Sequence, residues 1–130
     1  MQNADRFDVL TVERPALAAG QVTTCTWRTE RTMLFHRLVL LADDQATLYI
    51  AGESLCELTI GRRQLGMGLA LSDLASPVWL DRYIPRTARV MTIGEPMTLA
   101  IHGSRALMHP AELSILVVGR LPPSCYAPAA

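Results

Sequence analysis

Residues 58–66, LTIGRRQLG, place two adjacent arginines between two glycines, a spacing that could serve phosphate chemistry. A phosphate-binding loop needs several glycines that lead into a helix, followed by a lysine and a hydroxyl residue. This segment has no such lysine and no helical pattern after it. We therefore expect Gly61 to occupy a turn or bulge, with Arg62 and Arg63 solvated or paired with acidic groups on neighbouring strands. Direct contact of these arginines with phosphate or sugar is the alternative.

The three histidines, His36, His102 and His109, are the first candidates for metal binding. Metal-dependent sandwich enzymes of the cupin kind use two His separated by one residue, a nearby Glu and another His on a later strand. The sequence contains no HxH. His102 and His109 could meet across a hairpin, but HGSRALMH supplies no carboxylate between them. We expect no metal site, with these histidines on the surface or at an interface.

The serines and cysteines offer no activated nucleophile. No serine stands in a GxSxG elbow, and Cys25, Cys56 and Cys125 form no CxxC pair. Cys56 alternates with apolar neighbours in SLCEL, which predicts a core residue. Glu57 and Asp81 could form a carboxylate pair of the glycosidase kind, but a chain with this many acids always permits such a pair on paper. We expect no catalytic site, no cofactor and no small-molecule substrate.

The composition narrows the classes of partner. The 130 residues suit one domain, and a formal charge of zero gives no general attraction to nucleic acid or to an anionic membrane. Half of the residues are apolar and only 18% are charged, which favours a surface that partners cover. All 12 basic residues are Arg, which suits partly buried subunit contacts or reflects codon usage. No membrane span is expected, because no apolar run approaches about 20 residues. No secretory signal is expected, because MQNADRFDVLTVERP has no basic region followed by an apolar core.

The elements that must position these residues are strands, because the recurring hydrophobic period is two. Strands are expected over residues 20–29, 33–41, 46–52, 57–61, 95–103 and 111–120. In the last of these, Leu113, Ile115 and Val117 fall on one face, and Leu116 and Val118 fall on the other, so both faces are expected to be covered. Six to eight short strands at this spacing are typical of a sandwich or barrel.

Residues 69–90 interrupt this alternation. Ser72 followed by Asp73 could cap a short helical turn, while Pro77 and Pro85 limit any helix. We expect a long loop with at most a turn or two of helix. This loop either folds over one end of the sandwich or meets a neighbour.

The apolar residues of this loop predict a subunit interface. A free loop would not expose so many of them, and the arginine pair is assigned to the same contact. The expected interface residues are Trp79, Leu80, Tyr83, Ile84, Arg62 and Arg63. Replacing Trp79 with Ala is expected to impair assembly more than folding.

The order of these features resembles the small single jelly-roll coat proteins of bacterial viruses and related phage structural proteins. The resemblance rests on AGQVTTCTW, FHRLVLL, CELTIGRRQLG, the aromatic loop, IGEPMTLAIHG and LSILVVGRL, and covers about residues 18–121. It implies an all-β fold, a single jelly-roll antiparallel β-sandwich of about eight strands. Residues 1–17 then form an N-terminal arm or edge strand, residues 18–121 the jelly roll and residues 122–130 an extended C-terminal tail, as a frayed end or as an arm that reaches another subunit.

The resemblance also implies a function without catalysis. Such a protein is a structural part of the virion, made in the host cytoplasm, and it assembles with its own copies or with other capsid proteins into a shell. Direct binding of nucleic acid is not expected, because MQNADRFDVLTVERP is mixed in charge where the family carries a basic arm. The alternative function is a carbohydrate- or ligand-binding sandwich module, with Trp27, Trp79 and Tyr83 as the aromatic residues that could stack on sugar rings. A catalytic sandwich is the third possibility.

Overall fold

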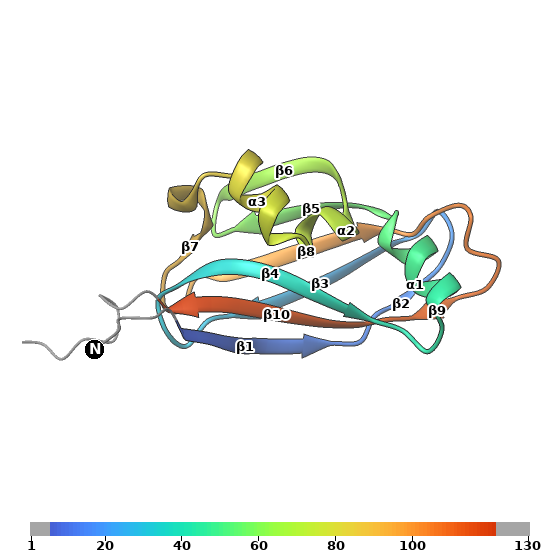
Figure 1. Ribbon diagram of the computed structural model, residues 1–130, viewed down its shortest axis with the longest axis horizontal. Helices are drawn as coiled ribbons and strands as arrows, with labels where there is room; N and C mark the ends of the chain where they lie inside the picture. Colours follow the sequence, from blue (N-terminus) through green and yellow to red (C-terminus); the bar gives the residue numbers. More distant parts are fainter. Residues whose placement is uncertain (1–5, 122–130) are drawn as a thin grey trace, which may run out of the picture.

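Two four-stranded antiparallel sheets face each other in the computed structural model, which describes residues 6–121 apart from the side chain of Met67 (Figure 1). The first sheet has the order β1-β10-β4-β7, with β1 at Arg6–Glu13, β10 at Ser114–Leu121, β4 at Met33–Leu41 and β7 at Val90–Met91. The second sheet has the order β3-β8-β5-β6, with β3 at Val22–Arg28, β8 at Pro96–His102, β5 at Leu55–Ile60 and β6 at Arg63–Ala70. A short ladder of β2 (Ala16–Leu17) and β9 (Ala111–Glu112) lies at one end of the sandwich.

The pairing of the eight principal strands is nested. The first strand of the chain pairs with the last, β1 with β10, and the next pairs inward are β3 with β8, β4 with β7 and β5 with β6. All four pairs are antiparallel, as in one long hairpin that has been rolled into two facing sheets. This arrangement is the jelly roll. The expected all-β, single jelly-roll sandwich is therefore confirmed.

The core lies between the two sheets because alternate side chains of each strand point inward. In β10 the buried and half-buried residues alternate without a break from Ser114 to Leu121. The same alternation runs through β8 from Pro96 to Ile101. The largest fully buried side chains come from both sheets and from the helices: Phe35, Leu17, Met33, Leu38, Leu58, Ile60, Leu71, Leu74, Leu80, Met91, Met97 and Leu99.

The expected strand over residues 46–52 is wrong, because this segment is the helix α1 (Gln45–Gly52). The side chain of Asp44 accepts a hydrogen bond from the backbone N–H of Thr47 at 2.7 Å and so caps the first turn. A seven-residue apolar run does not separate helix from strand by its period alone. Asp44, the second residue of the Asp43–Asp44 pair, is the N-cap of this helix.

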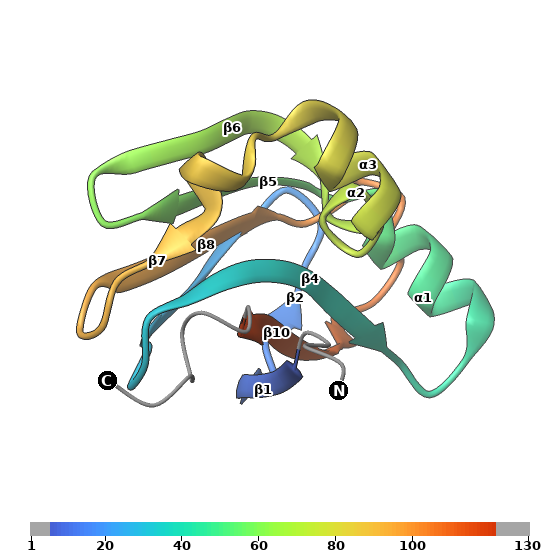
Figure 2. The same cartoon turned by 60° about the vertical axis from the view of Figure 1, so that its left-hand side comes forward.

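Residues 69–90 contain more helix than expected, although the segment does connect two strands. It holds three short helices: α2 (Leu71–Leu74), α3 (Pro77–Tyr83) and the 3₁₀ helix η1 (Arg86–Arg89). The side chain of Ser76 accepts from the N–H of Trp79 at 3.2 Å, and Pro77 occupies the first turn. Asp73, one of the two expected cap residues, accepts from the N–H of Ala70 at 3.2 Å. Figure 2 shows α1, α2 and α3 along the side of β4.

Strand β6 has no counterpart among the expected strands. Its sequence, RQLGMGLA, contains two glycines and breaks the alternation, and its ladder with β5 is irregular at two points. Gly61 and Arg62 form the two-residue turn before it, where Gly61 has φ +61. A Cβ at Gly61 would clash with Oε2 of Glu95, so both the backbone and the space favour glycine.

The N-terminal strand is part of the sandwich itself. β1 lies at the edge of the first sheet and pairs with β10 along Arg6–Glu13, with an irregularity between Val9 and Thr11. Residues before 18 therefore contribute both β1 and β2 to the jelly roll. The expected tail, residues 122–130, lies outside the described residues.

Leu80 is the best place to test how α3 is held. Its side chain is fully buried, while Val78 on the same helix is 74% exposed. Leu80→Ala is expected to lower the free energy of unfolding by about 2–5 kcal/mol, because it opens a cavity beneath α3. Val78→Ala is the matched control and should change it by about 0.5 kcal/mol or less. Equal effects of the two substitutions in urea denaturation would contradict this packing.

Candidate functional site

Two of the expected interface residues are buried inside the subunit. Leu80 is fully buried and Ile84 is 5% exposed, and both belong to the main core cluster. Their side chains attach α3 and the segment after it to the sandwich. The helix that Ser76 caps points these two side chains into the core of their own subunit, which leaves almost no exposed surface on them for the expected subunit interface.

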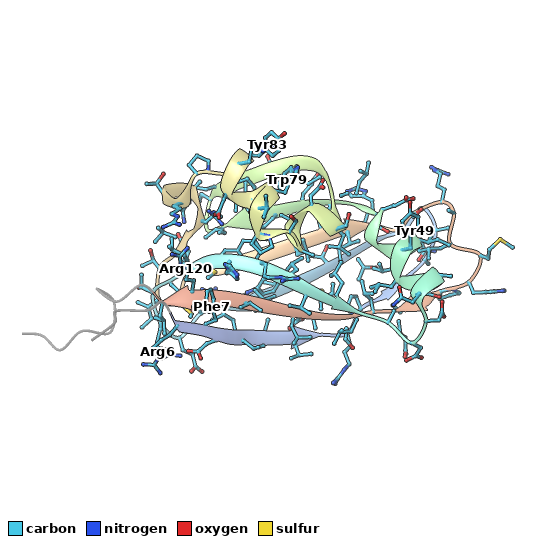
Figure 3. The ribbon with its side chains drawn as sticks, in the orientation of Figure 1. Arg6, Phe7, Tyr49, Trp79, Tyr83 and Arg120 are labelled. Atoms are coloured by element: carbon cyan, nitrogen blue, oxygen red, sulfur yellow. The ribbon has the colours of Figure 1, made fainter. Side chains whose placement is uncertain are left out.

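The aromatic pair on α3 is partly exposed to solvent. The rings of Trp79 and Tyr83 lie 5.0 Å apart at an interplanar angle of 43°. Trp79 is half-buried and packs against the core, whereas Tyr83 is 60% exposed. Figure 3 shows both side chains on α3, with Tyr49 on α1. Because Trp79 also supports the core, Tyr83 is the cleaner position at which to separate contact from folding.

The two arginines of the pair differ in their surroundings: one is exposed to solvent, and the other is hydrogen bonded within the subunit. Arg62 is exposed in the turn after β5. Arg63 donates to the carbonyl oxygens of Thr87 and Val90 and lies 3.3 Å from Oε1 of Glu95. These bonds attach β6 to the chain around β7. The expectation that an arginine of this pair contacts an acidic group therefore holds for Arg63, which connects segments of its own subunit.

The outer face of the first sheet is apolar. Strand register places three rows of neighbouring side chains on this face, across β1, β10 and β4. The rows are Phe7–Arg120–Leu34, Val9–Val118–Arg37 and Val12–Leu116–Val39. We call these nine residues the outer apolar face. Phe7, Val9 and Val12 are 52%, 51% and 45% exposed. Leu116 and Val118 are the residues that the sequence placed on the second face of their strand.

The outer face of the second sheet is polar by comparison. Its rows across β3, β8 and β5 are Val22–His102–Leu55, Thr24–Ala100–Glu57 and Thr26–Thr98–Thr59. The hydroxyl oxygens of Thr26 and Thr98 lie 3.4 Å apart. Cross-strand threonines stabilise a solvated sheet surface without an external cover. The two outer faces of the sandwich therefore differ in chemistry, and only the face of the first sheet needs an external cover.

Two arginines lie near one end of the outer apolar face: Arg120 belongs to the face, and Arg6 lies at the strand end beside it, where it pairs with the buried Leu121. Figure 3 shows Arg6, Phe7 and Arg120 where β1 begins and β10 ends. The imidazole of His36 lies there with its ring 4.5 Å from that of Phe7. Burial lowers the pKa of His36, and the charges of Arg120, Arg37 and Arg89 lower it further, against a smaller opposite effect of Asp81. The neutral imidazole is favoured, so this histidine packs as part of the apolar surface.

A buried cation supports the face from the side of α3. Arg89 is 4% exposed and donates to Oδ1 of Asp81 at 2.7 Å and to the carbonyl oxygen of Phe35 at 3.5 Å. The hydrogen bond from Arg89 holds the pKa of Asp81 below its usual value. The pair connects η1, α3 and β4. Nothing in the sequence marked Arg89, because its neighbours in RTAR look like an ordinary solvated turn.

Two hollows of similar size open beside these surfaces. One, of about 530 Å³, lies on the second sheet and includes Glu53, Glu57, His102 and Arg105 in its lining. The other, of about 520 Å³, lies between β4 and α1 and adjoins the outer apolar face at Arg37 and Val39. Its walls include Leu48 and the exposed ring of Tyr49.

The described cysteines are buried, and no metal-ligand cluster occurs within residues 6–121. Cys56 is fully buried, as its pattern predicted, and burial raises the pKa of its thiol to about 12. Burial also raises the pKa of Cys25, while Cys125 lies outside the described residues. Within residues 6–121, no three His, Cys, Asp or Glu side chains gather as metal ligands, and no helix is long and apolar enough to cross a membrane.

No protein-family model matches this chain, and no match was found among curated proteins or among solved structures. The jelly-roll pairing and the outer apolar face are therefore the observations from which function is argued.

His36 makes stability depend on pH in a defined direction. Its pKa is about 6.5 in an unfolded chain and lower in the folded protein, so the unfolded chain binds more protons below that pH. Stability should fall as the pH drops through about 6.5 towards the folded pKa. His36→Asn should reduce the loss in unfolding midpoint between about pH 7.5 and about pH 5. The same reduction in His109→Asn, on an exposed loop, would refute the assignment to His36.

Proposed function

We propose that this chain is a structural subunit of a multi-subunit particle, and specifically a coat protein that assembles into a capsid shell. The observation that carries the proposal is the outer apolar face of the first sheet, which β1, β10 and β4 present together. A β-sandwich that works alone in water has polar residues on both outer faces. Here only the second sheet meets that description.

The size of the face fits repeated, individually weak contacts. Three strands of eight or nine residues, about 4.8 Å apart with about 3.3 Å per residue, span about 26 by 15 Å, or about 400 Å². The face is about half of the 800 Å² that each partner buries in a standard stable interface. Association itself costs roughly 4–15 kcal/mol. One contact is therefore marginal, whereas many contacts in a closed particle stabilise one another.

The proposed partners are further copies of this chain or other coat proteins, and the proposed place is the virion. The zero net charge supports a role in the shell wall without direct contact with the genome. The proposed role is also free of catalysis: the buried thiols are held protonated, and Asp81 and Glu95 are engaged by arginines that attach neighbouring segments.

Charges on the outer apolar face provide the test. The double variant Val9→Asp, Val12→Asp places two carboxylates on the exposed edge of that face, and burying them in a contact is unfavourable. We expect the wild-type chain, alone or co-expressed with its neighbours, to give large particles in light scattering and negative-stain microscopy. The double variant should shift this population towards single subunits.

Thr24→Asp, Thr26→Asp is the matched control, because these residues occupy the equivalent edge strand of the polar face and are exposed. The control should assemble like the wild type. Failure of the wild type to form any particle, alone or with co-expressed neighbours, would refute the proposed function. Circular dichroism on both double variants verifies that the strands are retained.

A ligand-binding module is the second candidate, favoured by the hollow on the second sheet. Glu57, His102 and Arg105 give it hydrogen-bonding groups of both signs, as polyhydroxylated ligands require. The aromatic stacking surface expected of such a module is not at this hollow, because Trp27 is buried and Trp79 and Tyr83 lie on α3.

A glycan array distinguishes this second candidate from the first. Binding of a defined sugar that falls at least about tenfold in Glu57→Gln would support the module, since a lost charge-assisted hydrogen bond contributes about 1.5–3 kcal/mol. Glu112→Gln, an exposed carboxylate on β9, is the control. Absence of any sugar binding would exclude carbohydrate recognition at this hollow.

A further inference from the structure

We propose that the hollow between β4 and α1 binds a small amphipathic carboxylate, a molecule with one carboxylate group on an apolar body. In this site the guanidinium of Arg37 holds the carboxylate, and the apolar walls of the hollow cover the body of the ligand. The proposal goes beyond the assembly role and does not rest on it, because residues of a single subunit line the hollow.

The hollow exists because residues 45–52 form a helix. α1 lies with α2 along the side of β4 (Figure 2), and the end of α1 is close to α2: a Cβ at Gly52 would lie 3.5 Å from Cβ of Ser72. The hollow measures about 520 Å³, within the range of about 300–1,000 Å³ that small-molecule sites occupy. No motif in the sequence indicates this site, because its walls come from separate elements that only the fold brings together.

The walls of the hollow are largely apolar. β4, α1 and the end of α2 contribute four half-buried apolar residues to its lining: Val39, Leu40, Leu48 and Ala75. The ring of Tyr49, labelled on α1 in Figure 3, also lines the hollow and is 71% exposed. An apolar ligand body that covers these side chains removes them from water, which is favourable.

Arg37 is the cation of this lining, and it is half-buried. Its Nε donates to the carbonyl oxygen of Leu38 at 3.2 Å, which orients the guanidinium. Among the described residues, its two terminal nitrogens have no hydrogen-bond acceptor and no carboxylate partner. Two parallel N–H groups of a guanidinium match the two oxygens of a carboxylate. Such a bond is stronger beside apolar walls than in water.

Glu53 limits the charge of the ligand. It is the acidic residue among those described in the lining, and it is exposed. It also lines the hollow on the second sheet, so it lies between the two hollows. One cation with one carboxylate in the same lining suits a ligand with a single negative charge. A phosphate monoester, which carries about two negative charges, is disfavoured.

Octanoate and 1-octanol are the probes, because they pair a carboxylate with a neutral alcohol on similar apolar bodies. An amide NMR titration at neutral pH should show octanoate binding with shifts in α1 and β4. Arg37→Gln should weaken octanoate binding at least about tenfold, because it removes a charge-assisted bond. Binding of 1-octanol should be weaker in the wild type and change less than about twofold in Arg37→Gln, since the alcohol carries no charge.

Arg105→Gln is the matched control, because Arg105 is the arginine of the other hollow. It should leave octanoate binding within about twofold of the wild type, as should Glu53→Gln. Ala75→Leu fills the hollow at a backbone conformation that leucine adopts readily, and it should weaken both probes. Unfolding midpoints close to the wild type verify that each variant is folded.

Absence of octanoate binding, or equal binding by the wild type and Arg37→Gln, would overturn the proposal. An equal loss in Arg105→Gln would overturn it by placing the ligand on the second sheet. So would tighter binding of octylamine than of octanoate, because Glu53 and not Arg37 would then select the ligand. Particle formation is measured separately, so particles without octanoate binding, or binding without particles, refute one proposal and leave the other standing.

Discussion

The constraint on which this molecule depends is that one sandwich has one core. Each strand of the first sheet sends alternate side chains to opposite faces, and the core receives only Phe35, Leu38, Ile115, Val117 and their neighbours. Yet β4 and β10 are apolar on both faces, so the nested pairing that buries one set leaves Leu34, Val39, Leu116 and Val118 on the outside. These four residues stay half-buried in the folded subunit.

The helices beside β4 are held by the interior of the subunit. Leu80 and Ile84 enter the core, and the buried Arg89 forms an ion pair with the exposed Asp81 that connects η1 to α3. The same guanidinium donates to the carbonyl oxygen of Phe35 on β4, so it fixes the position of α3 against that strand. Much of the apolar surface of residues 69–90 is therefore buried within the subunit. The apolar surface that stays exposed lies instead on the outer face of the first sheet.

Sequence reasoning recovered the parts of the fold that depend on period two. The strands β3, β4, β5, β8 and β10 were each predicted close to their observed positions, because their alternation is intact. Strand β6 was missed because its glycines remove the pattern. Helix α1 was taken for a strand because its short run has no distinctive period, and the hydrogen bond that the Asp44 side chain accepts from Thr47 caps it as a helix. The two-sided character of β10 was visible in Leu116 and Val118. The partners of those residues on β1 and β4 were not, because register is a property of the paired strands.

The difference between the two outer faces shows how the sandwich can carry an apolar outer face and still fold, because the other outer face is polar. The threonines of the second sheet keep that side solvated, so the sandwich presents one apolar outer face and not two. An apolar face on each side would allow copies to stack without limit, because contacts between unlike faces do not close. A single apolar face of only about 400 Å² confines any such contact to one side of the sandwich. His36 contributes to this balance: its neutral form packs against Phe7, and a proton on it would add charge to a surface that already holds Arg37 and Arg120.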